Sequence, residues 1–156
     1  MDAIGLQLER LLGGTVAPDG NVIFENILSS FGPVSYEPIT GVITINKTGR
    51  YLVNWWVVTQ SSSGLIGISF AIVTSQGDEF LGGSPIKTAE FSGVALIQVD
   101  AAPITLRLAS RTVNNVTYSP LLTSKAFLVL GEVPEETGIT GTTGATGDTG
   151  PTGTAG

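Results

Sequence analysis

Residues 51–59 read YLVNWWVVT, and the side-chain pattern of this stretch indicates the fold class. Successive side chains of a β-strand point to opposite faces. The two faces of this strand would carry Tyr51, Val53, Trp55 and Val57, and Leu52, Asn54, Trp56 and Val58. A strand with one face in water shows polar residues on that face. Since one asparagine is the only polar side chain on either face, we expect both faces to be buried.

Other runs of the chain differ in whether one or both of their strand faces are apolar. Residues 126–130 (AFLVL) and 94–99 (VALIQV) are apolar on both faces, except for Gln98, whereas residues 104–110 (ITLRLAS) alternate between apolar and polar. In a two-layer sandwich, one face of each sheet packs in the core. The second apolar face must then be covered by another copy of the chain, the alternative being an apolar face that arose by chance.

Short β-rich runs separated by Gly, Pro, Asn, Asp and Ser continue from residue 21 to residue 133. About ten antiparallel strands at this spacing predict an all-β sandwich or barrel. The expected strands are 21–25, 33–37, 41–46, 50–60, 65–75, 79–83, 88–100, 102–112, 115–119 and 125–133.

The first residues show a different spacing. Ile4, Leu8, Leu11 and Leu12 recur at helical intervals, and two glycines follow. We therefore expect residues 1–14 to form a short helix or docking segment, the alternatives being a frayed terminus or an expression remnant. The β-sandwich head would then span residues 15–131.

A collagen-like segment, residues 138–156, follows a linker at 132–137. Glycine stands at every third position, as a triple helix requires, because only a hydrogen fits as side chain at its axis. The glycines are Gly138, Gly141, Gly144, Gly147, Gly150, Gly153 and Gly156, and threonines that are candidates for O-glycosylation stand at Thr140, Thr143, Thr146, Thr149 and Thr152. A flexible linker would not need this phase. Six triplets with one proline need a partner domain that brings three chains together.

The amino-acid composition excludes several classes of function. The chain has no Cys and no His, which removes disulfides, thiolate or imidazole zinc sites and the usual nucleophilic triads. A net charge of −6 gives no footprint for nucleic acid. No run is apolar for the roughly 18 residues that a membrane span needs, and no secretory signal is seen at the N-terminus. We expect neither an enzyme nor a cofactor, and self-association fits the 42% hydrophobic content.

A few polar groups remain as candidates for metal binding or for fixing the arrangement of subunits. The acid pairs Asp78-Glu79 and Glu135-Glu136 lack the dense spacing of a Ca²⁺ loop, and are better explained as solvated charges. Asn54 stands alone on an apolar strand face. It is either a locally satisfied amide or a residue that fixes register or oligomeric state, as single buried amides do in helical assemblies.

The order of these features resembles one family. Residues 24–56 and 89–108, with Phe24, Tyr36 and Gly49-x-Tyr51, resemble C1q/TNF-like domains, and residues 125–130 their closing strand. The resemblance implies a jelly-roll homotrimer with Tyr51, Val53 and Trp55 in the core. It also implies a trimer interface formed by Leu52, Asn54, Trp56 and Phe127.

The Gly-x-Thr triplets resemble those of BclA-type collagen-like proteins of Bacillus and Clostridium spore surfaces, the exosporium. In those proteins and in C1q the collagen segment precedes the head, whereas here it follows. The expected function is a structural one: a head that trimerises and nucleates or caps a triple helix in a bacterial or spore surface filament, where other filament proteins would be partners. The alternative is a ligand-binding head of a surface or phage fibre.

Overall fold

The structure is a computed structural model, and it describes residues 2–60, 67–84 and 90–135. Within these ranges the chain forms twelve β-strands and no helix, so the all-β prediction is confirmed. The strands are β1 (Gly5–Arg10), β2 (Thr15–Val16), β3 (Asn26–Phe31), β4 (Val34–Glu37), β5 (Val42–Ile45), β6 (Gly49–Val58), β7 (Ile68–Thr74), β8 (Glu79–Ser84), β9 (Glu90–Val99), β10 (Ile104–Ser110), β11 (Val116–Thr117) and β12 (Ala126–Val133).

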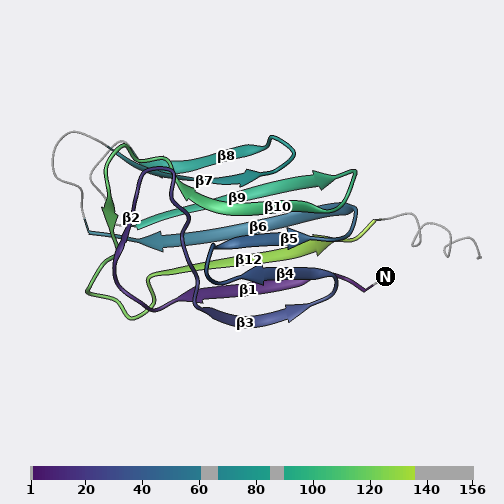
Figure 1. Ribbon diagram of the computed structural model, residues 1–156, viewed down its shortest axis with the longest axis horizontal. Helices are drawn as coiled ribbons and strands as arrows, with labels where there is room; N and C mark the ends of the chain where they lie inside the picture. Colours follow the sequence, from purple (N-terminus) through teal and green to yellow (C-terminus); the bar gives the residue numbers. More distant parts are fainter. Residues whose placement is uncertain (1, 61–66, 85–89, 136–156) are drawn as a thin grey trace, which may run out of the picture.

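Two five-stranded antiparallel sheets lie face to face (Figure 1). The first has the order β3-β1-β12-β6-β9 and is called the β12 sheet, after its central strand. The second has the order β4-β5-β10-β7-β8 and is called the β10 sheet. A small pair, β11 with β2, closes one end. No two neighbouring strands of the β12 sheet are consecutive in sequence, and in the β10 sheet β10 lies between β5 and β7, which is the crossing pattern of a jelly roll.

The core fills the space between the two sheets. Tyr51, Val53 and Trp55 point into it and are almost completely buried, as expected. The indole of Trp55 meets the ring of Phe70 edge-on, with ring centroids 5.9 Å apart, and so joins β6 of one sheet to β7 of the other. This inward row leaves the alternate residues of β6 on the outside of the molecule.

The helix predicted within residues 1–14 is wrong, because Gly5–Arg10 form strand β1 within the β12 sheet. The prediction gave weight to Ile4 and Leu8 and overlooked Leu6, and these three residues are buried at the strand period of two. Pairing with β12 on one side and β3 on the other satisfies the backbone along the strand. The sandwich therefore begins before residue 15.

The strand predicted at residues 21–25 is also wrong. That segment contributes only a single bridge, between Asn21 and Ala109, while the strand β3 follows it at Asn26–Phe31. Strand β3 was missed because its sequence, NILSSF, lacks regular alternation, and a bulge at its partner Gln7/Leu8 shifts its register. At the other end of the domain, β12 ends at Val133, as the strand expected at 125–133 does, so the sandwich extends two residues beyond the expected domain boundary at 131.

Candidate self-association face

The outward side chains of the β12 sheet form one continuous surface, called here the outer face. Strand register places Trp56 of β6 beside Phe127 of β12 and Ser92 of β9. The next row holds Val94, Asn54, Val129 and Gln7, and the following row holds Leu96, Leu52, Gly131, Gly5 and Phe31. All four residues expected at the trimer interface, Leu52, Asn54, Trp56 and Phe127, thus lie together on this face.

The face is apolar at its centre and open to solvent. Leu96 is 60% exposed and Val94 is 64% exposed, and both are in β9. Leu52 lies directly across from Leu96 and is exposed to 39%. Exposed apolar residues that adjoin one another mark an interaction surface, whereas scattered ones do not.

Two aromatic contacts fix the shape of the outer face. The rings of Trp56 and Phe127 stack with centroids 5.5 Å apart, and the indole nitrogen of Trp56 donates a 2.6 Å hydrogen bond to the carboxylate of Glu90. The ring of Phe31 lies against Gly5, where an added Cβ would come within 2.1 Å of it. These side chains are already ordered, so association would cost little of their rotamer freedom.

Beside these aromatic side chains, the outer face carries a glycine, Gly131 of β12. A Cβ built at Gly131 meets nothing within 4 Å, so the middle of β12 leaves open space between Leu52 and Gly5 on the outer face.

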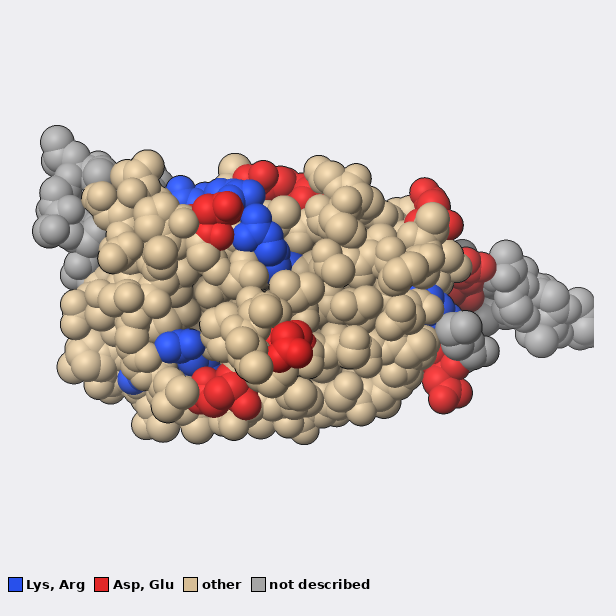
Figure 2. All heavy atoms as spheres, in the orientation of Figure 1, with Lys and Arg blue, Asp and Glu red and all other residues tan. Residues whose placement is uncertain are grey.

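The opposite side of the sandwich has a different chemistry. Outward positions of the β10 sheet include Ser35, Thr44, Thr105 and Arg107. Figure 2 shows that side of the molecule, where basic and acidic side chains adjoin each other. The outer surface of the β12 sheet is thus apolar at its centre, whereas that of the β10 sheet mixes ion pairs with the exposed Leu81 of β8. Such a difference was expected from the contrast between strands with two apolar faces and residues 104–110.

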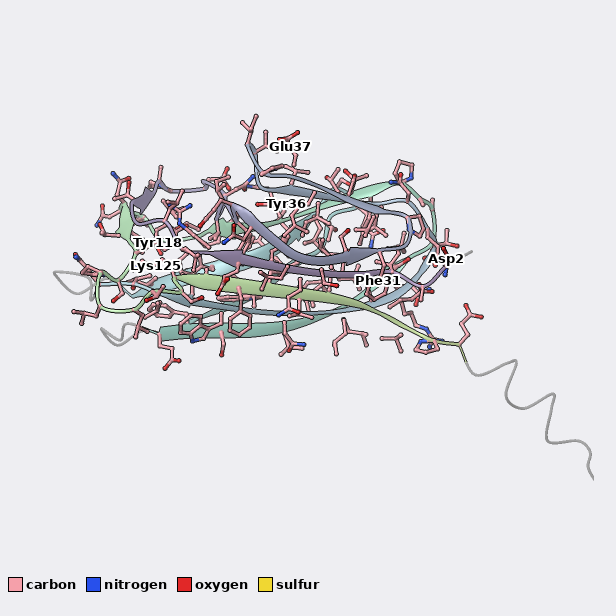
Figure 3. The ribbon with its side chains drawn as sticks, turned by 90° about the horizontal axis from the view of Figure 1, so that it is seen from below. Asp2, Phe31, Tyr36, Glu37, Tyr118 and Lys125 are labelled. Carbon is pink, nitrogen blue, oxygen red and sulfur yellow. The ribbon has the colours of Figure 1, made fainter. Side chains whose placement is uncertain are left out.

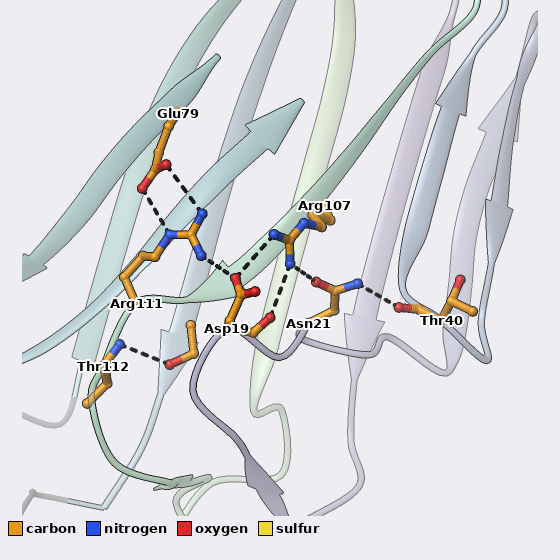
Figure 4. Close-up of polar contacts among 8 residues, drawn as sticks. Asp19, Asn21, Thr40, Glu79, Arg107, Arg111 and Thr112 are labelled. Carbon is orange, nitrogen blue, oxygen red and sulfur yellow. Dashed lines mark hydrogen bonds and ion pairs between the residues drawn. The ribbon is translucent and has the colours of Figure 1, made fainter. Parts of the chain in front are cut away.

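An ion-pair network covers part of the polar side (Figure 4). Arg107 and Arg111 both donate to the carboxylate of Asp19, and Arg111 also donates to Glu79, with Nε 2.9 Å from Oε2. The Arg107 guanidinium, together with that of Arg111, holds the pKa of Asp19 below its ordinary value. Asp78 and Glu79 are engaged with neighbouring side chains, and no group of three or more metal-ligating side chains occurs among the described residues.

Strand β12 leads into the glycine-rich segment. Its Glu132 carboxylate accepts hydrogen bonds from the Ile4 amide (3.0 Å) and the Lys47 ammonium (3.1 Å), with an ion pair of 2.8 Å to the latter. The start of β1 and the end of β12 therefore lie at the same end of the sandwich, where Figure 3 shows Asp2 and Phe31. A segment that follows β12 leaves from the same end as one that precedes β1.

The other end carries ordered loops with exposed leucines. Arg10 donates to the backbone carbonyls of Leu12, Gly13 and Ile23, and its guanidinium lies 4.2 Å from the ring centroid of Tyr118. Burial raises the pKa of Tyr118, whose hydroxyl has no hydrogen-bond partner in the described part of the chain. Exposed leucines at this end are Leu11, Leu12, Leu121 and Leu122.

Several residues of the outer face were not named from the sequence. Val94 and Leu96 lie in the VALIQV run, whose two apolar faces were noticed, so the same reasoning would have found them. Phe31 was missed together with its strand. The threonines and glycines of residues 138–156 lie outside the described residues.

No helix in the part of the chain that the structure describes is long and apolar enough to span a membrane. No family model and no curated protein matches the sequence.

Solved structures do match. The globular domain of zebrafish complement 1qA protein has a TM-score of 0.64 at 11% identity, and the match covers 85% of this chain and 98% of that one. The Eiger TNF structure from S. frugiperda has a TM-score of 0.60 at 17% identity, covering 86% and 95%. The PRD1 vertex protein P5 has a TM-score of 0.53 at 15% identity, covering 85% and 97%. The described residues therefore have the C1q/TNF-like jelly-roll fold.

Proposed function

We propose that the head associates into a homotrimer through the outer face of the β12 sheet, and that this trimer nucleates or caps a collagen-like triple helix. The observation that carries the proposal is the contrast between the two outer surfaces of one sandwich. Apolar residues at Leu52, Val94 and Leu96 adjoin on one side, while the other side carries ion pairs. Burying such a face gains roughly 25 cal/mol per Å² of apolar surface.

The position of β12 supports the proposed nucleation of a triple helix by the collagen-like segment, residues 138–156, called here the tail. Strand β12 is the central strand of the sheet that would face the other copies, and residues 138–156 follow it after four residues, 134–137. Three copies packed through this face would start their glycine-rich segments close together and at the same end. Tethering raises the effective concentration of the three tails to the order of millimolar, which offsets the entropy of ordering triplets that are poor in proline.

The proposed location of the protein rests on the sequence of the tail. Gly-x-Thr triplets with candidate O-glycosylation sites fit a structural protein in a bacterial or spore surface filament, with other filament proteins as further partners. Because the start of β1 and the end of β12 lie at one end of the sandwich, a collagen-like segment after the head leaves from the position that one before it would occupy. The unusual order of head and tail therefore does not prevent the same kind of rod.

The test is the solution mass of the full chain together with its collagen circular-dichroism signal. The expected mass is three times 16.1 kDa. The variant Trp56→Asp should be monomeric and lack the collagen signal. Gly131→Glu should act in the same way with an unperturbed fold, since its Cβ meets nothing within 4 Å.

Ile39→Asp is the matched control, because Ile39 is 85% exposed in the turn between β4 and β5, away from the outer face. Trimers of both face variants, each folded by far-ultraviolet circular dichroism, would show that the face has been assigned wrongly. A wild-type chain that stays monomeric at high micromolar concentration would end the proposal.

A second function is favoured by the opposite end of the sandwich. Hydrogen bonds from Arg10 and to Glu25 hold the loop that exposes Leu11 and Leu12, as expected for a preformed contact surface. A ligand-binding head of a surface or phage fibre would use such a tip. A glycan-array screen of the full chain tests it, with Leu12→Asp as the variant that should lose any binding found.

A further inference from the structure

Asn54 has an unusual position within the outer face. It lies in the middle of β6, directly between Val94 of β9 and Val129 of β12. Its side chain is half-buried, and its amide takes part in no hydrogen bond within the described ranges 2–60, 67–84 and 90–135. Local satisfaction, one of the two explanations open from the sequence, is therefore not what keeps an amide at this position.

An unpaired amide matters once the face is covered. The group offers two donors and an acceptor, and sealing it against an apolar neighbour leaves these unsatisfied. The loss amounts to about a five- to hundredfold decrease in the association constant for each unsatisfied amide. Apolar contacts such as those of Leu52 and Leu96 tolerate sliding, because the hydrophobic effect is non-directional. Directional amides discriminate between arrangements, and among the described residues of this row they are Asn54 and Gln7, of which Asn54 is the more buried.

We propose that the Asn54 amides of associated copies hydrogen-bond to one another and so fix the register in which the outer faces pack. The inference rests on the proposed self-association. A primary amide can donate to the next copy and accept from the previous one, so identical amides around a symmetry axis can close a ring. A shifted arrangement that places the amide against Val94, Val129 or Leu96 of the other copy is disfavoured by the loss estimated above.

The first test is Asn54→Asp, followed by light scattering of the full chain across pH. Carboxylates that meet at a shared axis repel one another and raise each other's pKa. We expect a variant that is dissociated at about pH 7.5, with a more than hundredfold weaker association, and that reassociates on acidification as the carboxylates lose their charge.

The matched control is Gln7→Glu, which places a carboxylate on the same face at the exposed Gln7, separated from Asn54 by Val129. It should remain associated at about pH 7.5. Wild type is measured over the same range, because other charged groups face this surface. They are Glu9 on β1, Arg50 on β6 and Glu90 on β9, while β3 and β12 place none on it in the described residues.

The second test is Asn54→Leu, which is similar in size and removes the polar group. It should stay folded and associate at least as tightly, but native mass spectrometry should show several oligomeric states instead of one. A uniform trimer from Asn54→Leu, or an Asn54→Asp variant that dissociates no more than Gln7→Glu, overturns the role of Asn54 and leaves the trimer itself intact. A monomeric wild type overturns the proposed function instead.

Discussion

Replacing Leu96 by alanine measures how much the outer face contributes to association. The change removes about three methylene equivalents, each worth about 0.8 kcal/mol when buried. Since Leu96 is 60% exposed in the single chain, only that part is left for another copy to cover. The loss is therefore about 1.5 kcal/mol per copy and about 4 kcal/mol per trimer, or roughly a thousandfold in the trimer association constant.

Sedimentation equilibrium over a concentration series reads out this value. Because the trimer constant has units of inverse concentration squared, a thousandfold loss raises the midpoint concentration about thirtyfold. Ile39→Ala is the control, since Ile39 is more exposed than Leu96 yet lies away from the face. The reasoning is refuted when wild type forms trimers and the two variants shift their midpoints equally.

Three further predictions concern the head by itself. Gly93→Ala should lower the free energy of unfolding by about 1–3 kcal/mol in denaturant melts, because its Cβ would approach the indole nitrogen of Trp55 to 2.5 Å, whereas Gly131→Ala should change nothing. Asp19→Asn should flatten the acid side of the melting temperature plotted against pH. The lowered pKa of Asp19 means that its carboxylate stabilises the fold above about pH 4 and that this stabilisation is lost on acidification. Parallel profiles for the wild type and the variant would contradict the ion-pair geometry. Tyr118→Phe should leave the melting temperature at neutral pH unchanged or raise it. It should also weaken unfolding at alkaline pH, because the raised pKa of Tyr118 makes the stability of the wild type fall above about pH 10. A large decrease in melting temperature at neutral pH would reveal a hydrogen-bond partner for the hydroxyl.

Strands with strong alternation were predicted correctly because their pattern is local. Tyr51, Val53 and Trp55 are buried by the same periodicity that exposes Leu52 on the other face, and residues 104–110 are polar on the outside as their alternation indicates. The candidate site was found in part by this reasoning. Val94 and Leu96 were not named, although the same alternation in residues 94–99 places them on one face of their strand.

The errors came from segments whose structure depends on distant partners. Leu6 and Leu8 fit a strand or a helix equally well within ten residues of sequence, and β3 has hardly any pattern at all. Both became strands because β12, more than a hundred residues away, offers backbone donors and acceptors to β1, and β1 offers the same to β3.

The sequence by itself determined that the chain is all-β, that some of its strands are apolar on both faces, and that a glycine-periodic segment follows them, since each of these is written in local periodicity. Only the tertiary structure decided that the apolar second faces of β6, β9 and β12 adjoin on one sheet, with an unpaired amide at the centre and the tail-bearing strand in the middle. The physical reason is that sheet order is set by hydrogen bonding between strands far apart in the chain, which no local pattern encodes.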